Sequence, residues 1–149
     1  MADARLTTIH KKLQALLAVN HPTFSGVDLT GRVVRGSIVQ PPYTPFATVF
    51  FVDSVEQYGT TLGRYKSTAN FEAYIYIGGA NATERNDNAI NIASDAVKAI
   101  TANRQLSLGS LVDDVLVSYT AVDGDQYGLM NIGIGLLRIT ITFVSDDGV

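Results

Sequence analysis

The stretch YKSTANFEAYIYI, residues 65–77, decides the fold because small or apolar residues occupy every second position. Successive side chains of a β-strand point to opposite faces, so Phe71 and Ile75 share one face. This period of two predicts a strand with one buried face. The preceding apolar run ATVFFVD, residues 47–53, has the length of a second strand. The polar, glycine-containing residues 54–64 between the two runs therefore predict a hairpin with a long exposed tip.

Two further segments carry apolar residues at helical spacing. Residues 3–18 repeat leucine or isoleucine every three or four positions, which predicts an amphipathic helix with Asp3 as its N-cap. Residues 83–103 predict a second amphipathic helix, capped by Asn81 or Thr83. The expected buried stripe of this second helix consists of Ile90, Ala93, Ala96, Val97 and Ile100.

The remaining segments complete a sheet. Residues 111–122 and 129–144 alternate and are joined by the turn-rich residues 123–128, which predicts a second hairpin. Prolines and a glycine interrupt residues 20–45, so we expect an irregular arm or loop with one short, weak strand. No linker or repeat divides residues 1–149, which favours a single domain. The expected class is α+β, with a mainly antiparallel mixed β-sheet and both amphipathic helices packed on one face.

Composition argues against several classes of function. The 149 residues are 46% hydrophobic and carry a formal net charge of -3, so we expect neither disorder nor tight binding to nucleic acid. The sequence has no cysteine and only two histidines, and we expect no disulfide, no metal site and no cofactor. No segment has the apolar length of a membrane span or an export signal, which predicts a protein that remains in the cytoplasm where it is made.

Two motifs suggest chemistry but are better explained as structure. Gly133 and Gly135 begin a dinucleotide-binding pattern, but Arg138 stands at its third glycine position and the segment lies within a predicted strand. Glycines there favour close approach by another backbone or a bulky side chain. Residues 123–128 lack two of the oxygen ligands of a calcium loop and fit a hairpin turn. Because no catalytic constellation is evident, we expect a protein that is not an enzyme.

Charge is unevenly distributed along the chain. Residues 1–45 carry five bases and two acids, whereas residues 111–149 carry one base and six acids. This pattern has two explanations. The charges are distributed by chance over faces that meet solvent, or oppositely charged surfaces of two copies contact each other. Asp113 and Asp114 would point to opposite faces of a strand, so at least one of them would meet water or a neighbour. The candidate assembly residues are Arg32, Arg35, Tyr58, Arg64, Lys66, Asp113, Asp114 and Arg138.

Five segments in fixed order carry a resemblance to a known family. They are FATVFFVDSVEQY (46–58), YKSTANFEAYIYIGG (65–79), ATERNDNAINIASDAVKAI (82–100), NRQLSLGSLVDDVLV (103–117) and GLMNIGIGLLRITITFV (128–144). Together they resemble the tail terminator proteins of long-tailed bacteriophages such as lambda. The resemblance covers nearly the whole chain and rests on element order and pattern, with no invariant catalytic signature.

The resemblance implies a virion structural protein that forms a homohexameric ring on the last ring of the tail tube. Such a ring, at the head-proximal end of the tail, ends tube polymerisation and offers a docking surface to the head–tail connector or neck protein. DNA would pass through the ring without sequence-specific binding, and an acidic lumen would repel it. Before assembly the subunits would be found in the host cytoplasm.

Two alternatives remain at this point. Phage neck, head-completion and tail-tube proteins are of similar size and share parts of the same pattern. A neck or head-completion protein is therefore the alternative from the same structural class. A small hydrolase or ligand-binding domain is the alternative from another class, since active sites are assembled in space and need not be visible as motifs.

Overall fold

The computed structural model describes residues 4–19, 27–36, 40–58, 65–129 and 131–145. Its two helices are α1 (Arg5–Leu17) and α2 (Ala82–Thr101). Two short 3-10 turns, Gly109–Leu111 and Gly124–Tyr127, lie before and after the fourth strand. The strands are β1 (Val33–Arg35), β2 (Phe46–Tyr58), β3 (Tyr65–Gly78), β4 (Asp114–Asp123) and β5 (Ile132–Ser145).

All five strands belong to one sheet in the order β1-β2-β3-β5-β4. The pairs β2–β3 and β4–β5 are antiparallel hairpins, and antiparallel pairing of β3 with β5 joins them in the centre. Strand β1 pairs in parallel with the start of β2, which makes the sheet mixed. Both hairpins and the short strand within the irregular arm are therefore confirmed, and the class is α+β.

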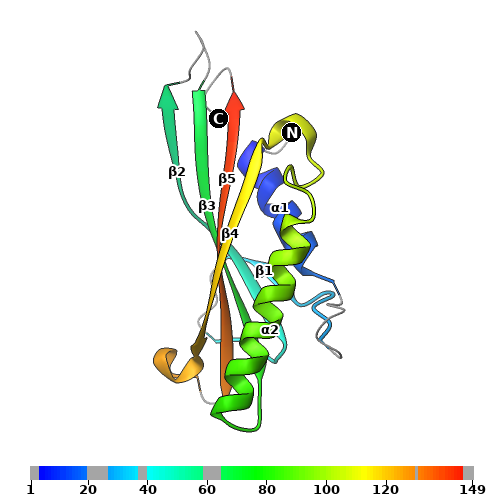
Figure 1. Ribbon diagram of the computed structural model, residues 1–149, viewed down its shortest axis with the longest axis vertical. Coiled ribbons are helices and arrows are strands. Elements are labelled where there is room, and N and C mark those ends of the chain that lie inside the picture. Colours follow the sequence, from blue (N-terminus) through cyan, green and yellow to red (C-terminus); the bar gives the residue numbers. More distant parts are fainter. Residues whose placement is uncertain (1–3, 20–26, 37–39, 59–64, 130, 146–149) are drawn as a thin grey trace.

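Both helices pack on one face of the sheet, as the sequence predicts, and Figure 1 shows them on the same side of the long strands. We call this the helix-covered face and the opposite one, which carries Asn70 and Thr140, the open face. The alternation of β3 is confirmed, because Phe71 and Ile75 are buried under the helices. The same core cluster includes Ile9, Leu13, Leu17, Ala69, Ala73, Ile92, Ile100, Leu137, Ile139, Ile141 and Phe143.

Helix α2 lies unusually close to β5. A Cβ atom added at Gly133 would lie 2.5 Å from the backbone oxygen of Arg85, and one added at Gly135 would lie 3.1 Å from the oxygen of Ala89. The two glycines thus let the helix backbone approach the strand, which is the structural role expected from the sequence. They belong to a strand and not to a nucleotide-binding turn.

The caps and faces of the helices differ in part from expectation. Asn81 caps α2 and accepts a hydrogen bond from the Glu84 N–H at 2.9 Å, as predicted. The prediction of Asp3 as the cap of α1 is wrong, because the N-cap is Ala4, without a side-chain bond. The expected burial of Ile90 is also wrong, since this side chain is 40% exposed. The helix presents Ala89, Ile92, Ala93, Ala96 and Ile100 to the sheet instead.

Two polar side chains of α1 bind the sheet backbone. The His10 imidazole donates from Nε2 to the Val49 carbonyl at 2.7 Å, and its ring lies 5.3 Å from that of Phe71. Gln14 Nε2 donates to the Val33 carbonyl at 2.8 Å. Because these carbonyls belong to the neighbouring strands β1 and β2, the two bonds fix α1 over that side of the sheet.

We expect stability to fall as the pH drops from 7 toward 5. Burial lowers the pKa of His10, and the nearby positive charge of Arg35 lowers it further, although the bond to Val49 acts in the opposite direction. The unfolded chain therefore takes up a proton near pH 6.5, before the folded chain does, which favours unfolding below that pH. Denaturant melts of wild type and His10→Gln across this range test the prediction. The variant should lose less stability on acidification, and equal pH slopes would contradict it.

One end of the open face has its own small core. Phe46, Tyr76, Leu129 and Ile134 are buried there in a second apolar cluster. The rest of the open face is not covered by any described element, so residues toward the other end of the strands meet solvent. That uncovered part is where a functional surface is expected.

The first hairpin is longer than the apolar run of residues 47–53 suggests. Strand β2 continues to Tyr58, so residues 54–58, expected to begin the exposed tip, are paired with β3. The remainder of that tip, residues 59–64, lies outside the described residues. The register of β2 against β3 shifts at Val52, between Phe51 and Asp53. Odd-numbered side chains of β2 therefore lie on the helix-covered face before this bulge and on the open face after it.

Candidate assembly surfaces

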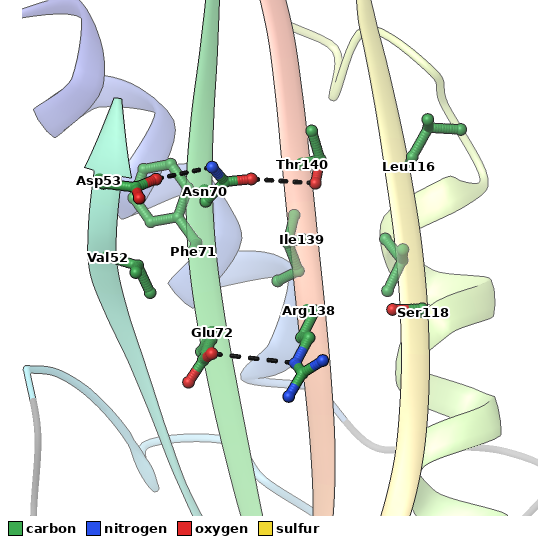
Figure 2. A pocket seen from close by; sticks show the side chains of 11 residues that line it. Val52, Asp53, Asn70, Phe71, Glu72, Leu116, Ser118, Arg138, Ile139 and Thr140 are labelled. Carbon is green, nitrogen blue, oxygen red and sulfur yellow. Dashed lines mark hydrogen bonds and ion pairs between the residues drawn. The ribbon is translucent and has the colours of Figure 1, made fainter. Parts of the chain in front are cut away.

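The open face has a shallow hollow of about 450 Å³ across its four long strands. Figure 2 shows the side chains that line it, with Val52 and Asp53 on β2, Leu116 on β4 and polar groups between them. Leu116 is 64% exposed, the largest exposure among the exposed large hydrophobic residues of the described chain. The hollow is thus a polar floor with an apolar side chain at either edge.

The polar floor is held together by its own hydrogen bonds. Asn70 Nδ2 donates to Asp53 Oδ1 at 2.6 Å, and the Thr140 hydroxyl donates to Asn70 Oδ1 at 3.1 Å. These three side chains form a row across β2, β3 and β5 in Figure 2. Because the amide of Asn70 has partners on both sides, the row serves to order the surface and shows no nucleophile with an activating base.

Arg138 lies on the same face beside Glu72. Arg138 Nε lies 4.0 Å from Glu72 Oε1, and the Arg138 side chain is 70% exposed, so this ion pair contributes little to stability. Of the candidate assembly residues that the structure describes, Arg138 is the one that lines the hollow. An exposed cation held only loosely by its neighbour is available to a carboxylate of a partner.

The other candidate assembly residues are spread over the molecule. The Arg32 guanidinium lies 4.8 Å from the centre of the Tyr43 ring and donates to the Pro45 carbonyl at 3.3 Å, so it holds a loop within the chain. Arg35 is exposed at the end of β1, and Asp113 is exposed just before β4.

Asp114 has a partner within the chain that the sequence does not reveal. Arg104 donates to both of its carboxylate oxygens, at 2.7 and 2.9 Å, and this bonding lowers the pKa of Asp114. Both groups meet solvent, so the pair mainly fixes the start of β4 and is a weak source of stability. Asp114 is therefore less available to a neighbouring copy than Asp113.

Two further candidates lie on the first hairpin. The side chain of Lys66 is exposed on the open face of β3. Tyr58 ends β2, with its backbone opposite Tyr65. Arg64 lies outside the described residues. The structure thus does not gather the candidates that it describes into one patch.

Charge nevertheless separates across the sheet. Arg35 lies on β1 at one edge, and helix α1, which packs on β1 and β2, adds Lys11 and Lys12. The opposite edge is acidic, with Asp113 before β4 and Asp125 in the turn after it. The uneven charge along the chain therefore becomes a basic edge and an acidic edge, because the sheet order places the first and fourth strands furthest apart.

The turn after β4 is held by a buried arginine. Asp123 accepts a hydrogen bond from the Asp125 N–H, and its carboxylate lies 3.4 Å from the Arg85 guanidinium of α2. Gly128 closes the turn at a φ of +74°, a conformation that favours glycine. This geometry is that of a hairpin turn, as predicted.

Within the described ranges, no three histidine, aspartate or glutamate side chains are grouped so that they would hold a metal ion. The same part of the chain contains no helix of sufficient length and apolar character to cross a membrane.

The comparisons with known proteins concern the fold. No protein-family model and no curated protein matches the sequence. The fold resembles a chain of a gene transfer agent. That chain comes from a solved structure described as the virion of a native gene transfer agent particle, with a TM-score of 0.58 and 8% sequence identity. The likeness covers 97% of this chain and 100% of the other, so it concerns the whole α+β arrangement and not one hairpin.

Proposed function

We propose that the protein is a structural subunit of a phage or phage-like virion and acts as a tail terminator. Copies form a ring, with six as the expected number, on the head-proximal end of the tail tube. The ring ends tube polymerisation and gives the head connector a surface to dock on. The observation that carries the proposal is the whole-chain likeness in fold to a chain of a gene transfer agent virion, together with the resemblance of the sequence to tail terminators.

The charge separation supports the ring. Cyclic assemblies use two different patches on each subunit, one meeting the other on the next copy. A basic edge that contains Arg35 and an acidic edge that contains Asp113 and Asp125 are two such patches on opposite sides of one sheet. Opposite charges favour this order of contact and disfavour meetings between like edges.

In this proposal the mechanism is binding alone, with no catalytic step, metal or cofactor. The partners are further copies of the chain, the tail tube protein and the head–tail connector or neck protein. DNA passes through the ring, and the net charge of -3 gives it no general attraction to the subunits. The subunits are made in the host cytoplasm and end in the virion, at the head-proximal end of the tail.

Deleting the gene from the phage or particle that encodes it tests the function. Without a terminator, tube growth has no stop, so we expect tails of uncontrolled length when lysates are viewed by electron microscopy. Restoring the wild-type gene from a plasmid should return tails to one length. Tails of normal length that are detached from heads would instead indicate a neck protein, and normal complete particles would contradict both roles.

A mass measurement tests the ring itself. Light scattering of the purified chain over a concentration series, with and without tail tubes, should show a closed species of several subunits. The tubes are included because a weak ring forms only where they supply a template. A chain that remains monomeric under both conditions would contradict the proposed ring and favour a monomeric ligand-binding or hydrolytic domain.

A further inference from the structure

Strand β4 is an edge strand without the features that normally prevent pairing. Among the described strands, only β5 pairs with it. Residues 115–122, VLVSYTAV, contain neither charge nor proline. Natural edge strands are usually protected by lysine, proline, a bulge or a covering element, because their free N–H and C=O groups otherwise pair with another chain. Leu116 is 64% exposed and Tyr119 is 46% exposed, so both faces of this strand offer apolar surface at the edge.

The other side of the sheet has a second open edge. Strand β1 pairs with β2 only over Ala47–Val49, and no other described strand pairs with that side of β2 farther along. From Phe51 to Val55, five consecutive residues of β2 are exposed. Phe51 is 43%, Val52 46% and Val55 51% exposed. Most of the large hydrophobic side chains that the described chain leaves exposed therefore lie on these two edges.

The directions of the two edge strands fit one another. Each of the steps from β2 to β3, β3 to β5 and β5 to β4 is antiparallel, so β4 runs opposite to β2. Rotation about an axis that runs along the strands preserves their direction. The β4 edge of one copy would therefore meet the β2 edge of the next copy in the antiparallel sense, which is the geometry of ordinary sheet pairing. Figure 1 shows β2 and β4 on opposite sides of the β3–β5 pair.

The bulge indicates where pairing begins. A bulge at Val52 interrupts the regular ladder, and bulges disturb pairing at an edge. The regular part of the β2 edge thus starts at Asp53, where Val55 projects from the open face together with Thr68 opposite it. In β4, Leu116 projects from this same open face, opposite Thr140 of β5.

We infer that neighbouring copies in the ring join by adding β4 of one copy to the Asp53–Tyr58 portion of β2 in the next, so that the sheets become continuous. This inference rests on the proposed ring and deepens it by naming the contact. Backbone hydrogen bonds supply the join, and the exposed apolar side chains of both edges are covered.

The first test places a charge on the β4 edge. Leu116→Lys introduces the residue that usually protects edge strands, at a site already exposed to solvent, so the fold should be retained. We expect the ring to be lost, or its assembly midpoint to rise at least tenfold, with an unchanged circular dichroism spectrum and Tm of the monomer. Ile90→Lys, on the exposed side of α2, is the matched control and should assemble as wild type does. Assembly of Leu116→Lys at the wild-type midpoint would overturn the inference.

The second test is disulfide trapping. The sequence has no cysteine, so only the introduced cysteines can form a disulfide. Val55→Cys is combined in turn with Leu116→Cys, Ser118→Cys and Thr120→Cys, because all four positions share the open face and the scan covers alternative registers. After mild oxidation, at least one pair should give a ladder of linked subunits on a non-reducing gel. Val55→Cys with Ile90→Cys is the control and should give no ladder.

The outcomes separate this inference from the proposed function. A wild-type ring in which no β2–β4 pair forms the ladder, or in which the control pair cross-links equally, overturns the edge contact and leaves the ring in place. A wild-type chain that never forms a ring, even with tail tubes, contradicts the proposed function and the edge contact with it.

Discussion

Replacing Phe71 with alanine is expected to lower the free energy of unfolding by about 3–5 kcal/mol, the usual cost of removing a fully buried phenylalanine. Phe71 is 1% exposed in the middle of β3. Its ring lies 5.3 Å from that of His10 on α1 and 5.5 Å from that of Phe51 on β2. The substitution therefore leaves a cavity where the helix, the first hairpin and the sheet centre meet, and these elements cannot all move to fill it.

Urea unfolding of the monomer, followed by circular dichroism, measures this loss. The Tm should fall by roughly 6–20 °C for a chain of this size. Phe51→Ala is the matched control, because the same side chain is removed from the neighbouring strand at a position that is 43% exposed. If Phe51→Ala lowered the free energy of unfolding as much as Phe71→Ala does, burial of Phe71 would not be what organises the core.

Substituting Gly133 with alanine is expected to cost about 2–3 kcal/mol, near the upper end for overpacking a close contact. The new Cβ would lie 2.5 Å from the Arg85 carbonyl oxygen, which belongs to the backbone of α2 and cannot rotate away. Helix α2 must shift as a unit, and its contacts with β3, β4 and β5 shift with it.

Gly135→Ala isolates that effect. Gly135 is in the same strand on the same face, and its added Cβ would meet its nearest neighbours at 3.1 Å. Neither glycine has a positive φ, so the intrinsic change from glycine to alanine is nearly the same at both positions. We expect Gly135→Ala to cost about 1 kcal/mol or less. Equal losses in a urea melt would contradict the close-approach explanation.

The sequence predicted the fold well where one periodicity dominated. The alternation around Phe71 identifies β3 and its buried face, because half-buried strands leave a strong period of two. The burial of Ile90 is predicted wrongly because several neighbouring helix faces are apolar, and packing against the glycines of β5 selects the face with Ala89 and Ala93. The length of β2 is underestimated because the strand continues beyond the apolar run of residues 47–53 into the polar residues 54–58.

The candidate assembly residues were harder to predict, because their availability depends on contacts across the fold. Asp114 is held by Arg104, which is ten positions earlier, and Arg32 is held by the ring of Tyr43. Leu116 shares one face of its strand with Ser118 and Thr120, and this pattern does not show whether the strand lies in the centre of the sheet or at its edge. Only the sheet order shows that its strand is at the edge. That order depends on β5 entering between β3 and β4, a pairing over long chain separations that local patterns do not specify.

The position of β5 also affects how the subunit is made. Ile132–Ser145 pairs with β3 on one side and β4 on the other, yet it leaves the ribosome after both. Until it emerges, the first hairpin has no central strand to join it to β4. The β4 edge therefore takes its place in the sheet only when synthesis of this region is complete. If copies join through this edge, as we infer, an unfinished chain lacks the surface with which to join.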